Sequence, residues 1–126
     1  MDVVFKLHSL FGERILTTLI VLGIIYLAAT WKADQKSPAI GRILAVLVDI
    51  QVAFGLALYI MAVTQGMAYP ATVYLHAAMG VLASGVAHMA AKNPPFLAKM
   101  GRFSPVAGFG LALLLVLIAV FVGRSI

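Results

Sequence analysis

The chain has no cysteine and few charged residues, with nine Lys or Arg and four Asp or Glu among 126 positions. The absence of cysteine excludes disulfides, thiolate-bound metals, cysteine nucleophiles and covalently attached c-type haem. A water-soluble domain normally has about a quarter of its residues charged, and the 10% found here is too little to cover a globule. A lipid-facing surface needs no such cover, so the composition indicates a membrane protein.

The formal net charge of +5 does not indicate nucleic-acid binding, because 63% of the residues are apolar. Basic residues in so apolar a chain are expected to set its orientation in the bilayer. Crossing a hydrocarbon core ~30 Å thick takes about 20 residues. Four crossings and short connections use the whole length, which predicts a single transmembrane domain without a soluble catalytic part.

Long apolar runs predict an all-α integral membrane protein, an up-and-down bundle of four transmembrane helices. The spans are expected at about 3–31, 40–64, 70–92 and 104–123. Pro38, the turn before Pro70 and the sequence Asn93-Pro94-Pro95 separate them, because proline cannot continue a helix that precedes it. Helices are favoured over barrel strands because the runs are long and do not alternate.

The basic residues are distributed unevenly between the two sides of this bundle. The first and third connections hold six of them: Lys32, Lys36, Arg42, Lys92, Lys99 and Arg102. The opposite side holds three: Lys6, Arg14 and Arg124. The excess of positive charge marks the cytoplasmic side. The sequence therefore predicts a multi-pass protein of the bacterial inner membrane with both termini outside.

Two histidines are expected at the same depth near the outer face. His8 lies ~8 Å into the first span and His76 ~9 Å into the third, at 1.5 Å per residue. The first and third helices run in the same direction and are expected to lie across a bundle diagonal. Paired imidazoles in a bundle core suit bis-histidine haem ligation. Interfacial histidines in a plainly packed bundle are an equal alternative.

Small and polar residues accompany the two histidines. Gly12 follows His8 by four residues, and Gly80 follows His76 by four, so each glycine shares a face with its histidine. Such glycines leave room for a flat porphyrin, but they also let bare helices approach closely. Gln51, near the expected midplane, can bond a neighbouring helix or a cofactor edge. Arg14, at the outer interface, can meet a haem propionate.

A third histidine, His88, has no histidine partner at its depth, so a second bis-histidine haem is not expected. Asp49 is the nearest polar residue in depth. An Asp49–His88 hydrogen bond and an Asp49–Arg42 pair would each relieve a buried charge. Structural pairing is the preferred interpretation of Asp49, and proton transfer the alternative. We expect no Ser-His-Asp triad and no carboxylate-rich metal cluster.

Short motifs in the first three spans resemble a bacterial family of small four-helix membrane proteins labelled cytochrome b-like. They are Leu7-His8-Ser9-Leu10, Asp49-Ile50-Gln51-Val52, Gly55-Leu56-Ala57-Leu58-Tyr59 and His76-Ala77-Ala78-Met79. A weaker likeness links the chain to one half of haem A synthase. The resemblance implies that His8 and His76 are axial ligands of haem b and that Gln51 is the characteristic polar residue of the second helix. Ala77 stands where the family usually has proline. Leu75 stands where an acidic residue is frequent, so the usual acceptor for orienting the His76 ring is absent.

These observations predict a membrane haem protein with one six-coordinate haem near the outer leaflet. Electron transfer is then the expected function. The haem would exchange electrons with quinol or with a partner redox complex. The chain could also assemble as a homo-oligomer. A cofactor-free accessory subunit of a respiratory or photosynthetic complex is the main alternative. Two others are a pigment protein that ligates chlorophyll magnesium through His76 or His88 alone, and a transporter that couples protons through Asp49 and His88.

Overall fold

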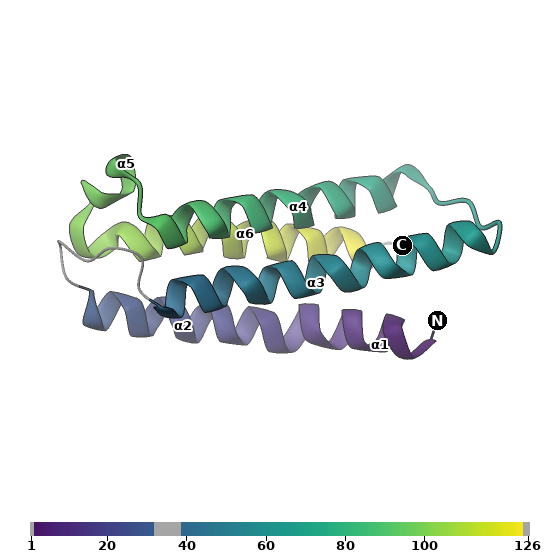
Figure 1. The fold of residues 1–126 in the computed structure, drawn as a ribbon, viewed down its shortest axis with the longest axis horizontal. Helices are drawn as coiled ribbons and strands as arrows, with labels where there is room; N and C mark the ends of the chain where they lie inside the picture. The colour runs from purple at the N-terminus through teal and green to yellow at the C-terminus, as the bar shows by residue number, and fades with distance from the viewer. Residues whose placement is uncertain (1, 32–38, 125–126) are drawn as a thin grey trace.

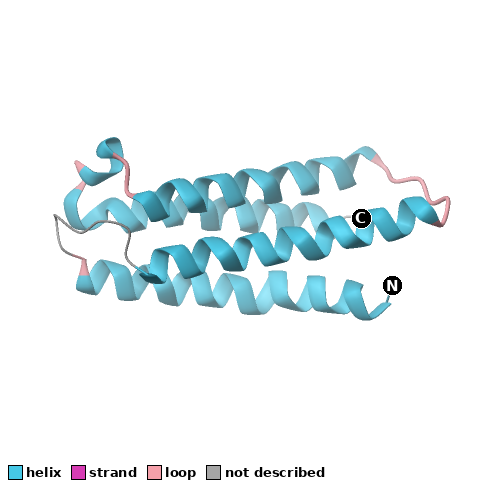
Figure 2. Cartoon of the chain, in the orientation of Figure 1, coloured by secondary structure: helices cyan, strands magenta, loops and turns pink. Residues whose placement is uncertain are grey.

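Four long helices run up and down side by side in the computed structural model, which describes residues 2–31 and 39–124 (Figure 1). The first helix comprises α1 (Asp2–Leu10), a π-helical turn η1 (Phe11–Leu16) and α2 (Thr17–Thr30). It is followed by α3 (Ala39–Thr64), α4 (Ala71–Lys92), the short α5 (Pro95–Ala98) and η2 (Gly101–Phe103), and α6 (Ser104–Arg124). The described part of the chain contains no strand, and helices make up nearly all of it (Figure 2).

The long helices begin and end within one residue of the ranges expected from the sequence. All four are long and apolar enough to span a bilayer. The expected break after the first span, with Lys32, Lys36 and Pro38, lies outside the described residues. The second break is a turn in which Gly66 adopts a positive φ of 76°. At the third break Asn93 takes the left-handed conformation, with φ 49° and ψ 63°, directly before Pro94.

The connection between α4 and α6 contains structure that the sequence analysis did not predict. Pro94 and Pro95 begin the single turn of α5, because a proline lacks only a donor that the first helical turn leaves free. Ser104, at the start of α6, donates from its hydroxyl to Asn93 Oδ1 at 2.5 Å. This hydrogen bond joins the end of α4 to the beginning of α6.

Each long helix packs against two neighbours. The first helix contacts α3 and α6, and α4 contacts the same two helices. The first helix and α4 therefore lie at opposite corners of the bundle, on the diagonal expected for the first and third spans.

The hydrophobic core fills mainly the half of the bundle next to α5. Its buried residues there include Leu16, Ile20, Leu27, Leu44, Ala45, Val48, Ala83, Ala87, Ala90, Phe109 and Ala112. The other half, where the described chain begins and ends, is packed less tightly. No residue of α1 is buried, and none of α4 is buried before Ala83. Within α3 only Ala62 is buried beyond Val48.

Candidate functional site

His8 on α1 and His76 on α4 meet in the loosely packed half of the bundle. Their ring centroids lie 5.8 Å apart, and the ring planes are nearly perpendicular at 86°. Both residues are half-buried. The two helices lie at opposite corners, so the rings approach each other across the bundle axis. The structure thus brings together the two histidines that the sequence placed at one depth.

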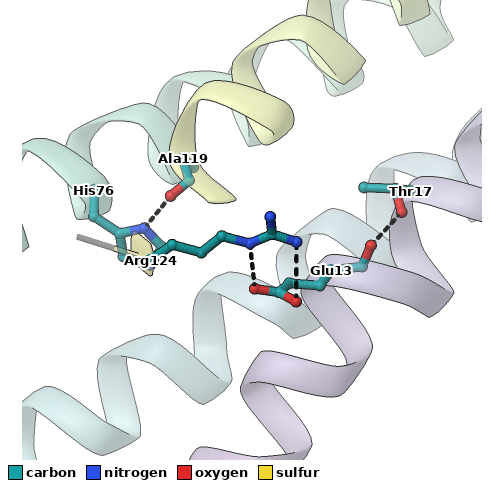
Figure 3. Close-up of polar contacts among 5 residues, drawn as sticks. All are labelled: Glu13, Thr17, His76, Ala119 and Arg124. Carbon is teal, nitrogen blue, oxygen red and sulfur yellow. Dashed lines mark hydrogen bonds and ion pairs between the residues drawn. The ribbon is translucent and has the colours of Figure 1, made fainter. Parts of the chain in front are cut away.

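A backbone carbonyl orients the His76 ring. Its Nδ1 lies 2.6 Å from the Ala119 carbonyl oxygen on α6 (Figure 3). Because a carbonyl only accepts, Nδ1 carries a proton, and in the neutral imidazole the lone pair is then on Nε2. A carbonyl partner of this kind commonly fixes the tautomer of a metal-ligating histidine. Ala119 therefore supplies the acceptor that the sequence around His76 lacks.

Glycines on the neighbouring helices make room for both imidazole rings. A Cβ atom at Gly55 on α3 would lie 3.0 Å from Cε1 of His8. A Cβ at Gly123 on α6 would lie 3.1 Å from both Cε1 and Nδ1 of His76. From the sequence, Gly12 and Gly80 were expected to leave room for a porphyrin, which is a different space. The roles of Gly55 and Gly123 could not be predicted from spacing, because neither is on the same helix as the ring that it faces.

Gln51 holds the backbone of the His8 turn. Its side-chain Nε2 donates to the His8 carbonyl oxygen at 2.7 Å. Gly12 permits this approach, because a Cβ there would overlap Gln51 Nε2. Gly80 is less constrained, since the nearest atom to its Cβ position is Val52 Cγ2 at 3.8 Å. Gln51 therefore bonds a neighbouring helix, one of the two roles expected for it.

Two polar atoms of this site are buried without a hydrogen-bond partner among the described residues. They are His8 Nδ1 and Gln51 Oε1. An unsatisfied buried polar atom costs about 1–3 kcal/mol. Such atoms are few in a folded protein. Binding of a further group at this site is one explanation for them.

Replacing Gly12 with alanine is expected to break the contact between Gln51 and His8. The new methyl group would occupy the position of the Gln51 amide, and the loss of one hydrogen bond should lower the free energy of unfolding by about 1 kcal/mol. Thermal unfolding in detergent, followed by circular dichroism, measures the change. Gly80→Ala is the matched control and should not be destabilised, because its methyl group meets only ordinary contacts. Equal destabilisation of both variants would contradict this account.

The π-helical turn η1 follows His8 directly and was not predicted. His8, Gly12, Leu16 and Ile20 recur at intervals of four residues, and an α-helix would rotate successive positions by about 40°. The wider turn of a π-helix offsets this drift and keeps the four residues facing the bundle. Gly12, Leu16 and Ile20 are all buried. A single π turn of this kind is frequent at functional sites.

Arg124 is a second cation at the end of the bundle where Arg14 was expected. Arg14 is exposed. Arg124 donates from Nε to Glu13 Oε1 at 3.1 Å and from Nη2 to Glu13 Oε2 at 3.5 Å, which joins α6 to η1 (Figure 3). It directly follows Gly123, which lies against the His76 ring. Because the four spans alternate in direction, the end of the fourth span lies on the same side as His8 and His76. This alternation could have identified Arg124 from the sequence.

Three tyrosines gather at the same end, around the turn between α3 and α4. The rings of Tyr59 and Tyr69 stack with centroids 6.0 Å apart. The Tyr59 hydroxyl lies 3.5 Å from that of Tyr74. Tyr59 is one turn beyond Gly55, so the cluster adjoins the histidine pair.

A second polar cluster lies where α3 and α4 meet, closer to α5. His88 Nε2 is 2.6 Å from Asp49 Oδ2, and the Ser84 hydroxyl donates to Asp49 Oδ1 at 2.5 Å. Of the two pairings considered for Asp49, the structure has the one with His88 and not the one with Arg42. The carboxylate stands between the hydroxyl and the imidazole, so the histidine cannot act as a base on Ser84. The cluster is therefore not a nucleophilic triad.

Residues 2–31 and 39–124 contain no group of three or more His, Cys, Asp or Glu side chains that could hold a metal ion. A metal held by side chains alone needs about four ligands. The His8–His76 pair supplies two imidazole side chains, and the described part of the chain adds no third ligand of these types.

Comparison of the chain with protein-family models, with curated proteins and with solved structures found no match. The resemblance to the cytochrome b-like family remains a prediction from the motifs.

Proposed function

We propose that the chain is a multi-pass protein of a bacterial cell membrane, with four transmembrane helices and both termini outside. Large apolar side chains are exposed all along the helices, and a surface of this kind is expected where lipid or another protein covers it. The basic residues described at the α5 end support a cytoplasmic position for that end. They are Arg42, Lys92, Lys99 and Arg102.

We further propose that His8 and His76 are the axial ligands of one b-type haem near the outer leaflet, and that electron transfer is the function. The separation of 5.8 Å between the imidazole rings carries this proposal. Metal–imidazole bonds are about 2.0 Å long, so two ligating nitrogens on opposite sides of a metal lie about 4 Å apart and the ring centres somewhat farther. The observed separation is of this size.

The surroundings of the rings support the same group. The hydrogen bond to Ala119 leaves Nε2 of His76 free to ligate, and His8 Nδ1 is a buried atom without a partner among the described residues. Gly55 and Gly123 leave the rings space.

His8 and His76 would hold the haem between them, and the bound haem would supply reversible electron exchange without a ligand position for a substrate. The chain contributes ligation and orientation. Gln51 anchors the backbone of the His8 turn. The ion pair of Arg124 with Glu13 places a cation at the histidine end, where it can meet an anionic propionate. We infer that electrons pass to and from quinol or a partner redox complex.

The test is an optical spectrum of the protein extracted from bacterial membranes washed with alkaline carbonate. An integral protein stays with the washed membranes, and the reduced-minus-oxidised difference should show the sharp bands of low-spin haem. Red pigment bands would instead indicate a chlorophyll site with a single histidine. A preparation that stays colourless after haem is supplied would contradict the haem proposal and favour a cofactor-free accessory subunit.

A further inference from the structure

The cluster of Asp49, Ser84 and His88 lies on the outside of the bundle. The side chains of His88 and Asp49 are 47% and 41% exposed, although they are hydrogen-bonded to each other. Both belong to helices that are long and apolar enough to span a bilayer. The cluster takes no part in the site formed by His8 and His76.

The depth of this cluster makes exposure to lipid unfavourable. His88 lies four residues before the end of α4 at Lys92, ~6 Å along the helix, and Asp49 lies ten residues after the start of α3, ~15 Å. Acyl chains provide no hydrogen bonds, and ionisable side chains within a span normally face protein or an aqueous cavity. We therefore expect protein, and not lipid, to cover the surface that holds His88 and Asp49.

The adjoining surface of α4 is suited to close helix packing. We call it the α4 outer face. It consists of five exposed residues: Ala77, Ala78, Val81, Gly85 and His88. A Cβ atom at Gly85 would meet nothing within 4 Å. Small residues in this arrangement let two membrane helices approach closely.

We propose that a second copy of this chain, inserted in the same orientation, packs on the α4 outer face. A two-fold axis along the membrane normal brings residues of equal depth together. The cluster contains a carboxylate, which accepts hydrogen bonds, and an imidazole, which can donate them, so two such clusters are complementary to each other. Dimerisation would shield Asp49 and His88 of both copies from lipid. This inference rests on membrane insertion and is independent of haem.

Disulfide cross-linking in native membranes tests the proposal, because the natural chain has no cysteine. The Gly85→Cys variant should form a covalent dimer under mild oxidation, since two cysteines bond only when their Cα atoms lie within about 7 Å. The Gly110→Cys variant is the matched control on α6, where a Cβ also meets nothing within 4 Å. We expect roughly tenfold more dimer from the Gly85 variant than from the control.

Counting the subunits of labelled protein in vesicles by photobleaching gives a second measurement. The unaltered chain and the Gly110→Leu variant should show two steps, whereas Gly85→Leu, which makes the α4 outer face bulky, should show one. Equal cross-linking at both positions, or single steps from the unaltered chain, would overturn the proposal. A covalent product of Gly85→Cys with a protein of different mass would also overturn it. Failure of the chain to stay in carbonate-washed membranes would instead contradict membrane insertion.

Discussion

Replacing either His8 or His76 with alanine is expected to abolish the low-spin haem spectrum, and replacing His88 with alanine should leave it unchanged. Each of the first two substitutions removes one of the two imidazoles whose rings lie 5.8 Å apart, and six-coordinate ligation needs both. His88 bonds Asp49 in a different part of the bundle. Reduced-minus-oxidised spectra of the three variants at equal protein concentration measure the effect.

A His8→Met variant separates ligation from folding. A thioether can replace one imidazole as an axial ligand, and methionine–histidine ligation raises the reduction potential. We expect this variant to keep six-coordinate haem and to titrate at a higher potential than the unaltered protein. Unchanged spectrum and potential in His8→Met, together with haem retention in His8→Ala, would show that His8 is not a ligand.

Replacing Gly108 with leucine is expected to separate α4 from α6 and to destabilise the bundle strongly. A Cβ at this position would lie 2.6 Å from the Cβ and 3.3 Å from the Cα of Ala90, and 3.2 Å from Leu97 Cδ1. An alanine methyl group and the helix backbone cannot rotate away, so the helices themselves must shift. Overpacking of this kind typically costs about 1–3 kcal/mol, and the contact with backbone places this variant at the upper end.

Reversible unfolding in detergent, followed by the fluorescence of the single tryptophan, Trp31, measures this loss. Trp31 packs against the core and therefore reports on its integrity. Gly110→Leu is the control two residues away on the same helix, and it should unfold like the unaltered protein because its Cβ meets nothing within 4 Å. Similar stability of the two variants would show that the α4–α6 contact tolerates separation.

Most of the helical architecture could be predicted from the sequence because its signals are local. Pro70, Asn93 and Pro94 end or begin helices through their own backbone preferences. The apolar runs between them have the length of a span. The short helix α5 was missed because a single turn begun by Pro95 has no periodic pattern to reveal it.

The candidate site could be predicted only in part. The depth of His8 and His76 follows from counting residues, and so does the end of the bundle at which Arg124 lies. The faces that these residues present depend on the rotation of each helix about its own axis. In the first helix the π turn after His8 changes that rotation for every residue beyond it, and Gly12 is buried against Gln51.

The sequence by itself determined four apolar helices, their order and the depth of each polar residue along its helix. This was possible because the length of an apolar segment and the positions of prolines can be read directly from the sequence. Only the tertiary structure decided which groups touch. It placed Ala119 and Gly123 around His76, joined Gln51 to the His8 carbonyl, and paired Asp49 with His88 on the outside of the bundle. Such contacts arise between helices, from side chains far apart in sequence, and depend on how each helix is rotated and packed against its two neighbours.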